Sequence, residues 1–240
     1  MVAFCEISGG NHTYEHTICK KIDGPVKVTT VLISVSDKSG LETLVPGLME
    51  INPEIRILST GGTYTKIKEI LGSRAAGTLV RVSDYTGQPE TKGGLVKTLD
   101  FKIYLGILTE TYNASHAGDL ERTGASPIDM VVVNLYPFEE TIKKDGTTPE
   151  MARGNIDIGG PCMIRASAKN FLRVASVVDP DDYDDILAEL KNNRGMTSLD
   201  TRFRLAQKAF AHTADYDRAI SDYLKDRTMA QVTSCYPEII

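Results

Sequence analysis

A length of 240 residues fits one large domain, and 41% hydrophobic with 25% charged residues is ordinary for a globular protein. The net charge of −5 argues against broad nucleic-acid binding, because there is no basic surplus to neutralise phosphates. No apolar run is long enough to span a bilayer and no signal sequence is recognisable, so we expect a cytoplasmic protein without membrane contact.

Residues 1–28 are predicted to form an extension of their own, followed by the main domain at residues 29–240. Two β-like runs flank Ser8-Gly-Gly-Asn11, which is typical of a hairpin, and Gly24-Pro25 indicates a linker. This stretch also holds four zinc-type ligands, but their spacing matches no zinc module, so we favour a decorated hairpin over a metal site. They are Cys5, His12, His16 and Cys19.

The main domain begins with two units in which an apolar strand leads into an amphipathic helix. The strands are expected at residues 29–36 and 55–58, and the helices after residue 36 and from residue 65. Ser36 is the expected N-cap of the first helix, and Pro46 should kink or shorten it. Successive units of this kind build a mostly parallel sheet between helices, with the ligand crevice at the carboxyl ends of the strands.

Each of these two strands is followed by a loop rich in hydroxyl groups or glycine. Backbone N–H groups, the helix dipoles and one ammonium group can hold an anion there, and we expect one phosphate to be shared between the two loops. A plain capped helix and an ordinary glycine turn are the alternatives. The candidate binding residues are Ser34, Ser36, Asp37, Lys38 and Ser39 in the first loop, and Thr60, Gly61, Gly62 and Thr63 in the second.

The later elements are less regular. Residues 80–83 are predicted to be a third strand, 104–108 to be strand-like, 129–135 to be the clearest buried strand and 173–178 to be a further strand. Helices are expected over 181–191 and 198–225, with charges and turns over 139–154. Because Pro137 ends the strand at 129–135, Asn134 and Tyr136 are expected at its carboxyl end, where ligand sites occur.

Residues 155–170 are predicted to be a polar turn that feeds a short apolar helix. Gly159 and Gly160 lack a Cβ, so a ligand can approach the backbone, and Pro161 suits a first helical position. Asp157 precedes the helix and Lys169 ends it. This arrangement suits an active-site wall, although a helix with ordinary end charges has the same pattern.

The stretch resembles the IDIGG…RAAAKN segment of the IMP cyclohydrolase family, and five more motifs follow the family's order between Val31 and Leu224. They are Leu32-Ile-Ser-Val-Ser-Asp-Lys-Ser-Gly40, Leu58-Ser-Thr-Gly-Gly-Thr63, Val96-Lys-Thr-Leu99, Val133-Asn-Leu-Tyr-Pro-Phe138 and Lys208-Ala-Phe-Ala-His-Thr-Ala-Asp-Tyr-Asp217. The resemblance implies a three-layer α/β fold of the methylglyoxal-synthase-like type. It also implies dehydrative closure of 5-formamidoimidazole-4-carboxamide ribotide to IMP by a homodimer, with a small ribonucleotide as substrate and no metal or redox cofactor.

The resemblance also implies roles for individual residues. Lys169 would transfer protons and Lys97 would stabilise developing negative charge. Asp157 would accept from the amide N–H or tune a neighbouring lysine, and Tyr136 would donate a hydrogen bond. Thr98, Asn134, Ile158 and Gly159 would read the base. Asp157 and Lys169 are about 15–18 Å apart along a straight helix. Lys169 can therefore join the site only if the substrate spans much of that length or the helix starts late.

Three positions depart from the family's pattern: Leu95 replaces an arginine, Asp100 a histidine and Phe101 a proline. The loss of a bidentate anion contact motivates a second hypothesis, a cyclase that acts on a related ribotide. A third is a ribotide- or phosphate-binding module without catalysis. The family's larger formyltransferase domain has no counterpart in the sequence, so we expect a separate formyltransferase to supply the substrate.

Overall fold

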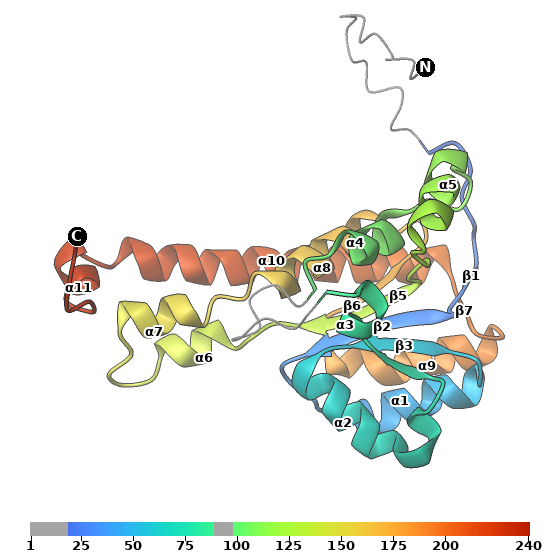
Figure 1. The fold of residues 1–240 in the computed structure, drawn as a ribbon, viewed down its shortest axis with the longest axis horizontal. Coiled ribbons are helices and arrows are strands. Elements are labelled where there is room, and N and C mark those ends of the chain that lie inside the picture. The colour runs from blue at the N-terminus through green and yellow to red at the C-terminus, as the bar shows by residue number, and fades with distance from the viewer. Residues whose placement is uncertain (1–18, 89–97) are drawn as a thin grey trace, which may run out of the picture.

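The computed structural model describes residues 19–88 and 98–240, in which a five-stranded sheet lies between two layers of helices (Figure 1). The strand order is β4-β3-β2-β5-β6, and every neighbouring pair is parallel. This confirms the expected three-layer α/β fold. The strands are β2 (Thr30–Val35), β3 (Arg56–Ser59), β4 (Leu79–Arg81), β5 (Met130–Asn134) and β6 (Ala175–Val177).

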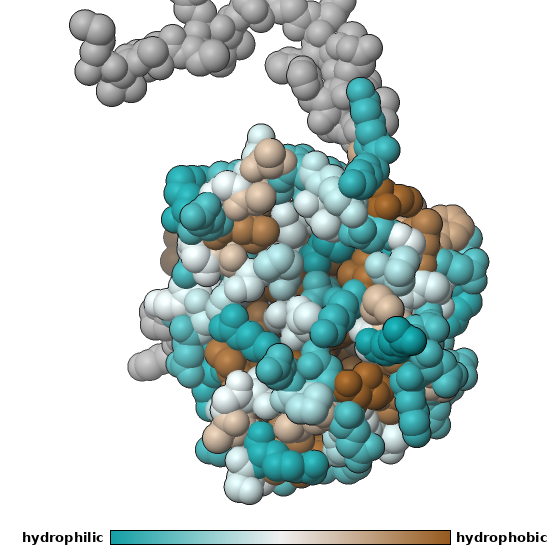
Figure 2. All heavy atoms as spheres, turned by 90° about the vertical axis from the view of Figure 1, so that its right-hand side faces the viewer, coloured by the Kyte–Doolittle hydropathy of each residue, from teal (hydrophilic) through white to brown (hydrophobic). Residues whose placement is uncertain are grey.

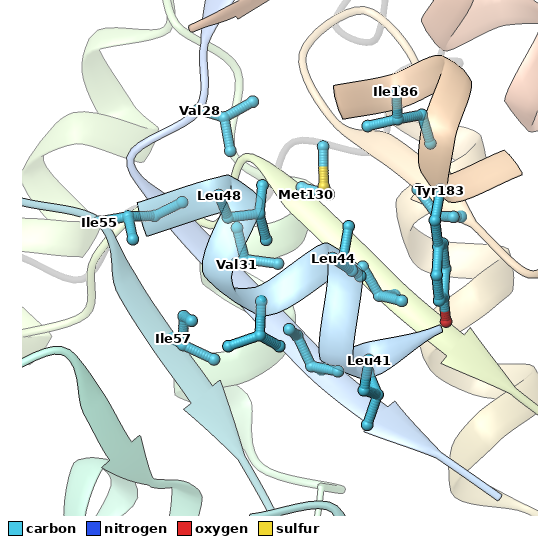
Figure 3. Close-up of a cluster of buried hydrophobic side chains, with 14 of the residues drawn as sticks. Val28, Val31, Leu41, Leu44, Leu48, Ile55, Ile57, Met130, Tyr183 and Ile186 are labelled. Carbon is cyan, nitrogen blue, oxygen red and sulfur yellow. The ribbon is translucent and has the colours of Figure 1, made fainter. Parts of the chain in front are cut away.

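The central strands supply both hydrophobic cores, because successive side chains of a strand point to opposite faces. Val31 and Ile33 of β2 belong to one core, whereas Leu32 between them belongs to the other. The first core lies beneath α1 (Leu41–Ile51), α2 (Gly61–Leu71) and α9 (Tyr183–Asn192). Figure 3 shows Leu44 and Leu48 of α1 in this core, with Ile186 of α9 nearby.

The second face of the sheet is covered by α4 (Phe101–Leu108), α8 (Gly159–Lys169) and α10 (Leu199–Lys225). Two shorter helices, α3 (Val82–Thr86) and α5 (Ala114–Thr123), precede β5. Single 3₁₀ turns lie at Gly72–Ala75 and Pro180–Asp182. None of the helices in residues 19–88 and 98–240 has the length and apolar character needed to cross a bilayer.

An arm extends from the body where the C-terminal half of α10 runs beside α6 (Phe138–Ile142), α7 (Pro149–Gly154) and α11 (Met229–Thr233) (Figure 1). Its small core contains Phe138, Ala152 and Tyr223. Figure 2 shows the end of the molecule opposite the arm, where hydrophobic residues occur in separate spots among hydrophilic ones. The visible face at that end therefore presents no broad apolar surface.

The segment expected to be a linker is attached to the body. β1 (Val26–Lys27) pairs antiparallel with β7 (Met196–Thr197). Arg202, fully buried on α10, donates from Nη2 to the carbonyl oxygen of Asp23 at 2.8 Å. The predicted hairpin and its ligands Cys5, His12 and His16 lie outside the described residues, so the boundary at residue 28 stays a prediction.

Two sequence-based element predictions were wrong in type, and a third, for a strand, was wrong only in its bounds. Residues 104–108 belong to helix α4, not to a strand, because Asp100 caps that helix by accepting from the Lys102 N–H at 2.8 Å. A short apolar run cannot by itself distinguish the two structures. The strand expected at 80–83 ends at Arg81, where α3 begins. Residues 139–154 contain α6 and α7.

Details at three helix starts also differ from expectation. Helix α2 begins at Gly61, not at Thr65, so Gly61, Gly62 and Thr63 form its first turn instead of a loop. Helix α1 begins at Leu41 behind Gly40, whose φ of 74° suits glycine, so Ser36 is not its N-cap. The helix continues past Pro46 to Ile51. Helix α8 begins at Gly159, two residues before Pro161.

Candidate functional site

A cavity of about 340 Å³ opens at the carboxyl edge of the sheet between β2 and β5. From β2 the chain proceeds to β3 and β4 on one side, and it later forms β5 and β6 on the other. The loops that leave β2 and β5 therefore diverge, and the crevice between them is where open α/β sheets bind ligands. The volume is within the range of small-molecule sites.

One end of the cavity is built to hold an anion. The N-terminus of α2 lies there, and Thr60, the residue that precedes the helix, makes no side-chain cap to its N–H groups. Its Oγ1 is instead 3.3 Å from Oγ of Ser34. A Cβ on Gly62 would lie 3.8 Å from Cε of Lys38, so the ammonium arm of Lys38 lies close to the helix start. A helix dipole and a full positive charge thus act at the same place.

The loop after β2 is held in shape by Asn134 at the end of β5. Its Oδ1 accepts from the N–H groups of Ser36 (2.6 Å) and Asp37 (2.9 Å), and its Nδ2 donates to the Asp37 carbonyl (2.8 Å). Asp37 in turn accepts from the Ser39 N–H and hydroxyl, which lowers the pKa of its carboxyl. Asp37 and Ser39 shape the loop but do not line the cavity.

The other end of the cavity carries the carboxylate of Asp157, immediately before α8. Its Oδ1 accepts from the Gly160 N–H at 2.9 Å. Burial raises the pKa of this carboxyl, against the opposing effect of the backbone N–H groups of Gly160, Tyr136 and Gly159. Gly160 leaves no free space for a side chain, because a Cβ there would lie 2.5 Å from Oδ2 of Asp157 and would force that carboxylate to move. A partly buried carboxylate of raised pKa suits proton transfer.

Tyr136 and Thr98 complete this end. Tyr136 follows β5, lines the cavity and is 53% exposed, so its hydroxyl group is accessible to a ligand. Thr98 is buried against α8, with Oγ1 only 2.8 Å from where a Cβ on Gly159 would lie. Lys97 and Leu95 lie outside the described residues. Asp100 is described, and it caps α4 instead of lining the cavity.

Lys169 lies at the far end of α8 from the cavity and is exposed. The helix runs from the carboxyl edge of the sheet to the opposite edge, about 16 Å at 1.5 Å per residue. Asn170, the next residue, donates to the carbonyl groups of Ile107 and Thr109 at that opposite edge. Lys169 therefore does not reach the cavity of its own chain.

Most of the candidate residues named from the sequence do meet at one place. The cavity is lined by Ser34, Ser36, Lys38, Thr60, Gly61, Gly62, Thr63, Thr98, Asn134, Tyr136, Asp157, Ile158, Gly159 and Gly160. Sequence reasoning missed further lining residues: Val35, Leu99, Gly154, Ile156 and Met163. All but Gly154 and Met163 adjoin a candidate residue in the sequence, so extending each motif by one position would have found them. In the described part of the chain, no cluster of three or more His, Cys, Asp or Glu side chains could hold a metal ion.

Two family models match consecutive parts of the chain. The family model described as "MGS-like domain" matches residues 40–162, and the one described as "AICARFT/IMPCHase bienzyme" matches residues 167–238. The bifunctional purine biosynthesis protein PurH of Thermoanaerobacter sp. (strain X514) is 48% identical over 87% of this chain and 39% of its own length. PurH of Sorangium cellulosum (strain So ce56) is 50% identical over 82% and 36%.

A solved structure, described as the crystal structure of ForH, is 33% identical with a TM-score of 0.69. The match covers 81% of this chain and 97% of that one. The chain therefore spans nearly the whole of the solved relative, but less than two fifths of the length of the curated relatives above.

Proposed function

Since the chain belongs to the MGS-like domain family, we propose that it is an IMP cyclohydrolase, which closes 5-formamidoimidazole-4-carboxamide ribotide to IMP in purine biosynthesis. The observation that carries this proposal is that one cavity has an anion-binding end and, opposite it, an end with a carboxylate and a phenol. An uncapped helix N-terminus with Lys38 suits a 5′-phosphate, and the partly buried Asp157 beside Tyr136 suits the reacting carboxamide. The names of the PurH relatives support a role in purine biosynthesis, and the family model described as "AICARFT/IMPCHase bienzyme" supports the cyclohydrolase reaction.

The reaction needs little more than these groups. The carboxamide nitrogen attacks the formyl carbon and loses a proton, and the oxyanion takes up a proton to give a carbinolamine. The hydroxyl group takes up a second proton and leaves as water, while the formamido N–H proton is lost and the C=N bond of the new ring forms. The Asp157 carboxylate accepts the amide proton, and the Tyr136 hydroxyl donates to the developing oxyanion. Lys97, which precedes Thr98 in the sequence, adds positive charge for the same oxyanion. Holding the phosphate at α2 and the base at the Asp157 end orients the two reacting arms of the substrate, and such orientation is worth several kcal/mol.

Lys169 can take part in the proposed reaction only if it reaches the cavity of a second copy of the chain. Its exposure at the end of α8 removes it from its own cavity, while the resemblance assigns it proton transfer. A homodimer in which Lys169 enters the partner's cavity would reconcile the two. An exposed apolar side chain, Phe203 (47%), packs edge-on against Phe171, which lies two residues after Lys169. Activity of Lys169→Ala equal to wild type would remove the residue from the mechanism, and full activity of a monomer would remove the intermolecular arrangement.

The deciding experiment is the absorbance change as purified chain converts the formamido ribotide to IMP, measured against spontaneous closure. We expect fast closure by the wild type and closure near background by Asp157→Asn. Closure of a related ribotide, but not of this one, would favour the altered cyclase suggested by Leu95. Saturable nucleotide binding without any turnover would favour a binding module. Asp100 no longer argues for an altered substrate, because its side chain caps α4.

A further inference from the structure

Tyr216, on α10, contacts the backbone of the cavity residue Asp157 but does not itself line the cavity. It lies in the motif Lys208–Asp217, the only one of the six motifs with no residue in the cavity wall. Its phenol oxygen accepts a hydrogen bond from the backbone N–H of Asp157 at 2.8 Å. Asp157 is therefore held at two points, by Tyr216 at its backbone and by the Gly160 N–H at its carboxylate.

The ring of Tyr216 makes a second connection. It packs edge-on against Phe138, with ring centroids 6.1 Å apart. Phe138 is buried at the start of α6, and its N–H donates to the carbonyl of Tyr136 at 2.8 Å. One side chain from α10 thus contacts both segments that carry the proposed acid–base groups, the loop before α8 and the turn after β5.

We propose that Tyr216 is a positioning residue, which fixes Asp157 at the orientation needed to take the amide proton during ring closure. This inference rests on the proposed cyclohydrolase function. The loop that carries Asp157 joins α7 to α8 and has no strand or helix of its own at residues 155–158. A misplacement of a reacting group by about 1 Å costs on the order of a hundred-fold in rate, so a single anchoring bond at this loop has a large effect on turnover.

Tyr223 offers a matched control. It lies on the same helix, packs edge-on against the same Phe138 ring at 5.9 Å, and is 7% exposed. Its hydroxyl group has no hydrogen-bond partner among the described residues. Tyr223→Phe therefore removes the same atom from the same aromatic cluster without touching Asp157.

The test measures kcat, KM, the pH profile and melting temperature of both variants, with Asp157→Asn alongside. For Tyr216→Phe we expect kcat to fall about ten- to hundred-fold with KM within about two-fold of wild type. The acid limb of its profile should move to lower pH, because a loosened Asp157 carboxylate is better solvated. For Tyr223→Phe we expect wild-type kinetics. NMR hydrogen exchange at the Asp157 amide should accelerate only in Tyr216→Phe.

The possible results distinguish a failure of the positioning role of Tyr216 from a failure of the proposed cyclohydrolase function. If wild type is active and Asp157→Asn is not, equal kcat and amide exchange in Tyr216→Phe and Tyr223→Phe would overturn the positioning role alone. A fall in kcat that tracks a lowered melting temperature, with unchanged amide exchange, would also overturn it, since that result describes a structural tyrosine. An inactive wild type, or a fully active Asp157→Asn, would defeat the proposed function, and the positioning role with it.

Discussion

The Asp157 carboxylate fills the space into which a side chain at Gly160 would extend, and the Gly160 N–H donates to that same carboxylate. Gly160→Ala should therefore displace the carboxylate or the Leu135 side chain, whose Cδ2 would be 2.6 Å from the new Cβ. We expect kcat to fall at least about ten-fold, with roughly 1–3 kcal/mol lost from the free energy of unfolding. Gly118→Ala is the control, because nothing lies within 4 Å of a Cβ there. Its kinetics should match wild type.

The pH dependence should reveal the burial of Asp157. Its raised pKa means that the carboxylate takes up a proton above the usual aspartate range, so the acid limb of kcat/KM should lie at a higher pH than for an exposed aspartate. The effect of this pKa on folding stability runs the other way: activity is lost as pH falls, whereas the stability contributed by the protonated carboxyl is lost as pH rises. A raised folded-state pKa gives stability that is complete below the unfolded-state pKa and is lost as pH rises through the folded-state value.

Asp157→Asn should consequently lower activity without lowering the melting temperature at neutral pH, because it removes a partly buried charge and keeps an oxygen to accept from Gly160. Activity and thermal unfolding measured on the same preparation check this. A clear loss of melting temperature at neutral pH would contradict the assignment of a raised pKa.

Asn134 should affect substrate binding more than turnover. Asn134→Ala removes two hydrogen-bond acceptor contacts and one donor from the loop that carries Ser36 and Lys38, so the phosphate end loses its shape. We expect KM to rise about ten-fold, equivalent to about 1.4 kcal/mol, with a smaller change in kcat. Asn113→Ala removes the N-cap of α5, away from the cavity, and should cost stability without changing KM.

The buried ion pair between Asp129 and Arg173 should dominate stability at the amino edge of the sheet. The Nη1–Oδ1 distance is 2.6 Å and both side chains are 7% exposed. Asp129→Ala leaves the guanidinium buried without its counter-charge, so we expect a loss of roughly 3–5 kcal/mol in urea unfolding. Asp119→Ala breaks an exposed pair with Arg122 and should cost at most about 1 kcal/mol. Equal costs would contradict this account.

The sheet and the anion-binding end of the cavity could be predicted because their signals are local. An apolar run followed by a hydroxyl- or glycine-rich loop predicts a strand and also the residues at the carboxyl end of that strand, such as Ser34 and Thr60. The contacts that organise the catalytic end are not local. Tyr216 is 59 residues from Asp157, and nothing in helical periodicity indicates which partner its hydroxyl group meets.

Lys169 shows that residues in one sequence motif can lie far apart in the structure. A motif that places a carboxylate and an ammonium at the two ends of one helix suggests that they act together, yet the rigid rise of that helix keeps them apart. The helix at Phe101–Leu108 is marked by its N-cap Asp100, a start signal that the apolar run at 104–108 does not contain by itself.

The burial of Arg202 has a consequence for the order in which the chain folds. Its guanidinium donates to carbonyl groups of Phe171, Leu172 and Thr197, and also of Asp23, 179 residues away near the start of the described chain. A buried guanidinium tolerates no missing acceptor, so α10 cannot complete its docking before the segment at Asp23 is in place. Synthesis delivers Asp23 ahead of Arg202 by 179 residues, so this contact waits until most of the chain between them has been made. A docking step that depends on a contact of such long sequence separation favours slow folding.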